Sequence, residues 1–152
     1  MSSHSASTVT PGAGSRTAGH GLLRAAAITT AAALVVNLVI WAVASAISDV
    51  PDRFTPLQPG SIVFMTVIGV AAAAGVYAFL RSRVSDPAAT FRSIVPVALA
   101  VSLIPDVLIW VSDGYEGAAK AETVLPLMAM HVATALVVVA LLPRRSGSRR
   151  DA

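Results

Sequence analysis

The sequence predicts an all-α fold, an integral membrane four-helix bundle with both termini in the cytoplasm. Of its 152 residues, 55% are hydrophobic and 12% are charged, against about 45–50% and about 25% in an average soluble domain. The 11 basic and eight acidic residues avoid four long apolar stretches, which contain one charge between them, Asp106. Cysteine is absent. A soluble globular domain, a disordered chain and a disulfide scaffold are therefore excluded.

The four apolar stretches are the predicted membrane spans. Each has a length within the roughly 17–25 residues that a helix needs to cross a hydrocarbon core of about 30 Å. None shows sustained alternation of polar and apolar residues, so helices are favoured over the strands of a barrel. The spans cover residues 25–47, 61–80, 94–111 and 123–142.

Turn-forming residues separate these spans. Segments 48–52, 56–60, 85–87 and 112–114 are rich in Pro, Gly, Asp and Ser, which favour turns and helix caps. Ser61 follows Pro59 and Gly60 and is predicted to be the N-cap of the second helix.

Polar segments flank a predicted transmembrane domain at residues 22–143. Residues 1–21 are rich in Ser, Thr, Gly and Ala without periodicity, which predicts a disordered cytoplasmic leader. Residues 144–152 carry four arginines and predict a basic cytoplasmic tail. One alternative is that the first span is a signal peptide cleaved after an Ala-x-Ala site near residue 46, although its apolar run exceeds the usual length of about 7–15 residues.

The basic residues predict the orientation. Nine of the 11 lie in the two terminal segments and the loop between the second and third spans, whereas Arg53 and Lys120 lie in the other two loops. Because cytoplasmic loops are enriched in Lys and Arg, both termini are placed in the cytoplasm. The excess of Arg over Lys, with abundant Ala and Val, indicates a GC-rich bacterial genome and hence the bacterial plasma membrane. Tyr77 and Trp110, near the ends of their spans, fit either interfacial anchoring or simple packing.

Asp106 is the most informative single residue. An ionised carboxylate within a span costs at least about 2.5–3.5 kcal/mol and usually faces the bundle interior or an aqueous cavity. His131, in the fourth span, is its candidate partner if the third and fourth helices are antiparallel neighbours. Ser102 and Ala98 share a helix face with Asp106 at four-residue spacing. Pro105 lacks an N–H and is expected to break the hydrogen bonding of the third helix and kink it near Ile104.

Asn37 and Thr134 complete the candidate polar site. Thr134 follows His131 by three residues and is expected on the same face, while Asn37 lies mid-span in the first helix, with Ala33 and Thr30 on the preceding turns. Such residues usually make structural interhelical hydrogen bonds. For Asp106 and His131 two interpretations stay open, a structural clamp and a proton or substrate role.

Sequence motifs for known chemistry are absent. The chain contains no G-x-x-x-x-G-K-[ST], H-E-x-x-H, G-x-S-x-G or C-x-x-C, so we expect no enzyme activity, no cofactor, no metal and no nucleic-acid partner. A triad of Ser102, Asp106 and His131 is disfavoured because the first two share one helix face and nothing identifies an oxyanion hole.

The leading hypothesis is a structural or accessory protein that acts through helix contacts in the lipid bilayer, as a homo-oligomer or with another membrane protein. The alternative is a small proton- or cation-linked transporter that uses Asp106 and His131.

Four segments of the chain resemble a known family. GLLRAAAITTAAALVVNLVIW, FTPLQPGSIVFMTVIGVAAAAGVYAFL, PVALAVSLIPDV and LPLMAMHVATALVVVALLP are similar to the small four-helix membrane proteins grouped as domain of unknown function family 6069, found mainly in actinobacteria. The resemblance covers about residues 21–143 and is most specific at Pro59-Gly60-Ser61, Ile104-Pro105-Asp106 and Met130-His131. It implies a four-helix membrane fold and supplies no activity and no catalytic residue.

Overall fold

The computed structural model describes the backbone of residues 13–147 and the side chains of residues 19–113 and 115–143. Within these residues all regular structure is helical, which confirms the predicted all-α class. A 3₁₀ helix, η1 (Thr55–Leu57), and a four-residue segment, α4 (Gly114–Gly117), lie in the connections. The four long helices are α1 (Ala13–Ile47), α2 (Pro59–Arg83), α3 (Pro87–Val111) and α5 (Ala121–Gly147).

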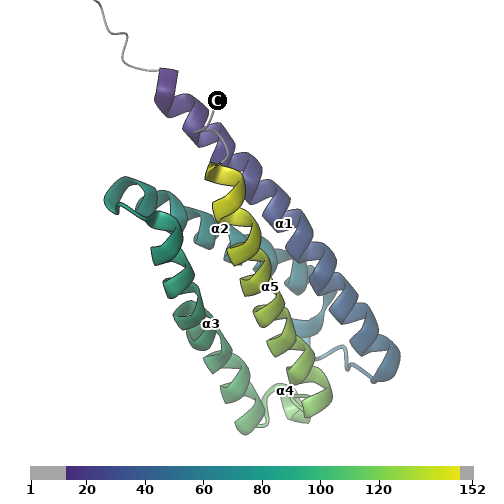
Figure 1. Ribbon diagram of the computed structural model, residues 1–152. Coiled ribbons are helices and arrows are strands. Elements are labelled where there is room, and N and C mark those ends of the chain that lie inside the picture. The colour runs from purple at the N-terminus through teal and green to yellow at the C-terminus, as the bar shows by residue number, and fades with distance from the viewer. Residues whose placement is uncertain (1–12, 148–152) are drawn as a thin grey trace, which may run out of the picture.

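The long helices run up and down in one bundle (Figure 1). The start of α1, the α2–α3 turn and the end of α5 lie at one end, which we call the terminal end. The connections that contain η1 and α4 lie at the other, the paired-loop end. Helix α5 lies between α1 and α3, and it packs against all three other long helices, most extensively against α1.

All four long helices are long and apolar enough to cross a membrane, with mean hydropathies between 2.1 and 2.3. They also extend beyond the apolar stretches. Residues 13–21 belong to α1, so the prediction of a disordered leader is wrong there, whereas residues 1–12 lie outside the described part of the chain. Residues 144–147 likewise continue α5, and residues 148–152 are outside the description. The physical reason is that starting a helix is costly and extending it is cheap, so the spans propagate into their flanks.

Of the predicted turns and caps at the helix starts, the one before α3 is confirmed and the serine cap before α2 is wrong. At the α2–α3 turn, Asp86 is the N-cap of α3, and its Oδ1 accepts a hydrogen bond from the Ala89 N–H at 2.9 Å. Helix α2, however, begins at Pro59, and Gln58 is its N-cap without a side-chain hydrogen bond. The predicted Ser61 cap is therefore wrong, because the fixed φ of Pro59 suits the first position of a helix.

Pro105 does not break α3. The helix runs continuously from Pro87 to Val111 through both Pro96 and Pro105. A proline removes one intrahelical hydrogen bond, and membrane helices tolerate this loss where neighbouring helices, side chains and small backbone adjustments satisfy the freed group. Pro105 therefore does not end the helix, and the kink expected near Ile104 stays a prediction.

The interior holds two apolar clusters. At the terminal end, Tyr77 packs edge-on against Phe91 with ring centroids 5.2 Å apart, so packing accounts for this tyrosine. The terminal-end cluster contains Ala25, Ala33, Val70, Tyr77, Leu80, Phe91, Val138 and Leu142. The paired-loop cluster contains Phe54, Leu57, Ile62, Ala118, Ala119, Val124 and Met130.

Candidate functional site

Asn37 ties three helices together. It lies on α1, is 3% exposed, and its Nδ2 donates hydrogen bonds to Thr66 Oγ1 on α2 and to Thr134 Oγ1 on α5, both at 2.9 Å. Along α2 and α5, each threonine lies between a residue of the paired-loop cluster and one of the terminal-end cluster. The structure therefore brings Asn37 and Thr134 together, with Thr66 as a partner that sequence analysis missed.

One end of the Asn37 amide has no partner. Its Oδ1 is buried, and no described group donates a hydrogen bond to it. Exchanging the amide oxygen and nitrogen would let both threonine hydroxyls donate to Oδ1, but the nitrogen would then lack an acceptor. An unpaired buried polar group costs about 1–3 kcal/mol. The site thus has spare hydrogen-bonding capacity of the kind that an ordered water fills.

Asp106 and His131 face each other across the α3–α5 interface. Asp106 Oδ2 lies 3.2 Å from His131 Nδ1, and the carboxylate side chain is 5% exposed while the imidazole is 34% exposed. This separation is that of an ion pair, yet Oδ2 receives no hydrogen bond of good geometry. Nδ1 is shared, because it also lies 3.0 Å from the carbonyl oxygen of Leu127, one turn earlier on α5.

These contacts form one polar layer across the bundle. His131 and Thr134 are three residues apart on α5, a spacing that puts their Cβ atoms about 5–6 Å from each other on one helix face. Helix α5 therefore connects the Asp106 contact on α3 to the Asn37 contact on α1 and α2. We call this set the polar layer, and it consists of Asn37, Thr66, Asp106, His131 and Thr134.

Ser102 does not join the polar layer. It is half-buried, and its hydroxyl donates to the carbonyl of Leu99 on its own helix at 2.8 Å. Ala98, which was expected on the same inward face, is exposed, and that prediction is wrong. Thr30 is similarly occupied within its helix, since its hydroxyl donates to the Ala26 carbonyl at 2.9 Å.

Thr29, rather than Thr30, is the fully buried threonine of α1. Its Oγ1 has no partner among the described residues. Buried residues of α1 occur at 25, 29, 33, 37 and 44, and the first four form a row that winds around the helix because four residues exceed one turn by about 40°. The small residues at 25 and 33 were the available signal, since small side chains mark close helix approach in membranes.

The polar layer offers a clamp and a titratable pair. No three His, Cys, Asp or Glu side chains gather to hold a metal ion in the described part of the chain. The hydroxyl of Ser102 is engaged with Leu99 and is not set as a nucleophile beside His131. The arrangement can hold helices together, and it sets the imidazole of His131 beside the carboxyl group of Asp106 inside the bundle.

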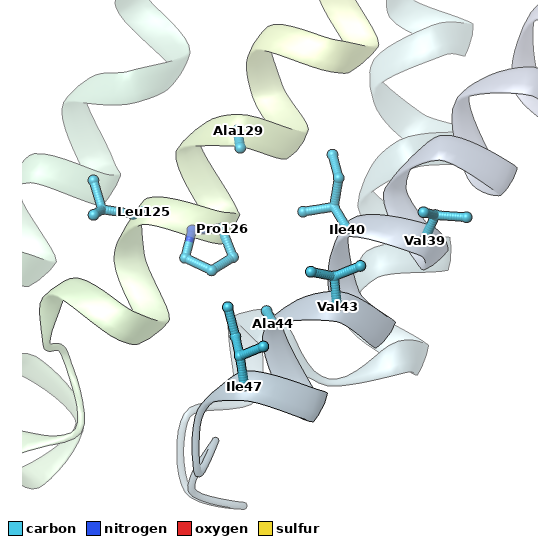
Figure 2. A pocket seen from close by; sticks show the side chains of 8 residues that line it. All are labelled: Val39, Ile40, Val43, Ala44, Ile47, Leu125, Pro126 and Ala129. Atoms are coloured by element: carbon cyan, nitrogen blue, oxygen red, sulfur yellow. The ribbon is translucent and has the colours of Figure 1, made fainter.

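A groove of about 390 Å³ lies between α1 and α5, apart from the polar layer. Figure 2 shows its walls, in which side chains from the end of α1 face side chains from the start of α5. Every lining residue is apolar, so the groove has no side chain able to bind a polar ligand or do chemistry. The lining residues are Val39, Ile40, Val43, Ala44, Ile47, Leu125, Pro126 and Ala129.

Comparison with protein-family models shows which family the chain belongs to. The family model described as Family of unknown function (DUF6069) matches residues 17–148. The chain belongs to this family. The match includes every residue of the polar layer of this DUF6069 protein, and the family description names no activity. No curated protein and no solved structure matches the DUF6069 chain.

Proposed function

We propose that this chain is a non-enzymatic structural or accessory protein of the bacterial plasma membrane that acts through helix contacts. The observation that carries the proposal is the Asn37 bridge, in which one buried amide joins α1, α2 and α5. Lipid tails are as apolar as the helices, so packing and interhelical hydrogen bonds must hold such a bundle together. The proposal includes no cofactor and no nucleic-acid partner.

The proposed orientation puts the terminal end in the cytoplasm. Nine of the 11 basic residues lie in the two terminal segments of the sequence and around the α2–α3 turn, and the positive-inside rule places segments rich in Lys and Arg in the cytoplasm. We also propose that the first span is retained. Cleavage near residue 46 would remove Asn37 and with it both hydrogen bonds of the bridge.

Helix α3 supports a homo-oligomer. It is the least buried of the four long helices. Large exposed apolar residues follow one another along it at alternating steps of three and four, the spacing of a helix–helix seam. We propose that this seam contacts a second copy of the chain. The seam residues are Ile94, Val97, Val101, Ile104, Leu108 and Val111.

The second candidate function is a small proton- or cation-linked transporter. It is favoured by the Asp106–His131 pair, in which a buried carboxylate keeps one oxygen without a hydrogen bond and the imidazole stays partly exposed. An ionisable residue inside a membrane often marks a proton or ion pathway. Four helices are few for a carrier, so this candidate also requires assembly of several copies.

A flux measurement separates the two candidates. The purified protein is reconstituted into vesicles that contain a pH-sensitive dye, and a pH gradient is applied with and without an alkali-cation gradient. The structural proposal predicts the proton leak of empty vesicles, and an Asp106→Asn protein that keeps its helical content. A transporter predicts flux that Asp106→Asn abolishes and Ser102→Ala retains, since the Ser102 hydroxyl bonds only within its own helix. Flux of that kind would overturn the structural proposal.

A further inference from the structure

The tautomer of His131 follows from the two atoms that face its Nδ1. The carbonyl oxygen of Leu127 lies at 3.0 Å and Asp106 Oδ2 at 3.2 Å. A carbonyl oxygen can only accept a hydrogen bond, and an ionised carboxylate oxygen likewise accepts. Nδ1 therefore carries the proton of the neutral ring, and Nε2 keeps its lone pair.

Nε2 lies on the open side of this arrangement. About a third of the His131 side chain is exposed, whereas Asp106 is buried. Nε2 is not among the buried unpartnered atoms, and no described group hydrogen-bonds to it. The Leu127 carbonyl and the buried carboxyl group of Asp106 both face Nδ1, and the basic nitrogen Nε2 can be reached from outside the pair.

Among the residues that the structure describes, the membrane-spanning stretches of the neighbouring helices bring no other titratable group against the pair. The apolar stretch of α1 contains none, and that of α2 contains only Tyr77, which packs against Phe91 at the terminal end. The remaining members of the polar layer are neutral. With Asp106 ionised and His131 neutral, the pair carries one uncompensated negative charge in the bundle interior, a costly arrangement.

A proton is the ligand that fits these atoms. Hard metal cations require several oxygen ligands, and the pair offers one unfilled carboxylate oxygen. No group of three acidic, histidine or cysteine side chains occurs within the described residues. A proton needs a single lone pair, which Nε2 provides.

We propose that Nε2 of His131 is a proton-binding site within the bundle and that Asp106 is its positioning residue. A hydronium ion transfers its proton to the Nε2 lone pair and leaves as water, so one N–H bond forms and the imidazole becomes an imidazolium. Asp106 stays a carboxylate, and the charge of the pair changes from −1 to zero. The proposal deepens the transporter candidate by naming the proton as its substrate. Proton transport by this site rests on that candidate, whereas proton binding at Nε2 does not.

Nitrogen NMR of ¹⁵N-histidine protein in lipid bilayers tests this site directly. The chain has three histidines, and replacing His4 and His20 with Gln leaves His131 as the only labelled side chain. At about pH 8 we expect a protonated Nδ1 and an unprotonated Nε2, and Nε2 gains its proton as the pH falls through the histidine range. A neutral ring protonated at Nε2, or no proton uptake down to about pH 4, overturns the proposal.

The role of Asp106 is tested in the same experiment. Asp106→Asn keeps the size of the side chain and an accepting oxygen but removes the charge, so the tautomer persists while proton affinity falls about tenfold or more. Ser102→Ala is the matched control on α3 and leaves both readouts unchanged. Unaltered proton affinity in Asp106→Asn contradicts the positioning role. If that variant does not fold, the tautomer and proton uptake of the otherwise unaltered chain still decide the main proposal. Vesicles without flux would overturn transport alone.

Discussion

Substitution of Thr134 measures how much one hydrogen bond of the Asn37 bridge contributes to the stability of the bundle. Thr134→Val keeps the shape of the side chain and removes the hydroxyl that accepts from Asn37 Nδ2. Interhelical hydrogen bonds in membranes are worth about 0.6 kcal/mol on average and at most about 1.7, so we expect the free energy of unfolding to fall by about 1 kcal/mol. Denaturing-detergent titration followed by fluorescence of the two tryptophans measures this change.

A double-mutant cycle isolates the contact. In an Asn37→Leu background, Thr134→Val should cost much less, because its partner is already gone. Thr30→Val is the matched control, since the Thr30 hydroxyl bonds only to the Ala26 carbonyl of its own helix. Equal costs of Thr134→Val in both backgrounds would show that the bridge does not contribute to stability.

The polar layer could be predicted in part from single residues. A charge, an imidazole and an amide are rare in membrane spans because each is costly there, so Asp106, His131 and Asn37 stand out without any structure. A threonine is different, since its hydroxyl can bond to its own helix and face lipid. Thr66 therefore carries no local signal, and Thr29 is indicated only indirectly, by the small residues at 25 and 33 on the same row of α1. The winding of each helix against its neighbours shows which threonine faces inward.

The connection between α3 and α5 is a strained left-handed turn. Tyr115 and Glu116 have φ of 54° and 55° with ψ of 45° and 43°, and Gly117 has φ of 77°. Each non-glycine residue in this conformation costs roughly 1–2 kcal/mol. The Tyr115 ring packs edge-on against the buried Phe54, with centroids 5.2 Å apart. Packing against a residue from the other connection thus holds the turn in place.

Glu116→Gly relieves part of this strain. Glycine adopts positive φ without penalty but loses about 0.5–1 kcal/mol through the flexibility of the unfolded chain, so we expect a net stabilisation of about 0.5–1 kcal/mol. The same substitution at Glu122, in the first turn of the right-handed α5, should instead destabilise. Unfolding titrations of the two proteins give the comparison. Destabilisation by both would mean that the turn is not left-handed in the folded protein.

This turn also shows which features of the secondary-structure elements could not be predicted from the sequence. Ser, Asp and Gly at residues 112–114 reveal that the chain turns after Val111, because their backbone preferences are local. The handedness of the turn depends on Tyr115 meeting Phe54, a contact between distant parts of the chain. The continuity of α3 through Pro105 similarly depends on its surroundings rather than on proline alone.

The molecule as a whole directs its polar groups inward and an ordered apolar seam outward. On α3 the inward face carries Phe91, Ser102 and Asp106, all buried or half-buried, while the seam lies on the opposite side of the helix. An α-helix with two such faces can pack on its own bundle and on a second copy at once. In the homo-oligomer that we propose, the outward seam of this least buried helix is the contact surface.

Cysteine crosslinking tests this association in the membrane. The chain has no cysteine, so a single Val101→Cys substitution places one thiol in the seam. In a symmetric dimer built on the seam, this residue lies near its own copy, within reach of a disulfide that requires a Cα separation of about 4.4–6.8 Å. We expect mild oxidation of membranes to give a crosslinked dimer. Phe64→Cys, on an exposed face of α2, is the matched control and should remain monomeric; equal crosslinking of the two, or none at Val101, would exclude the seam as the interface.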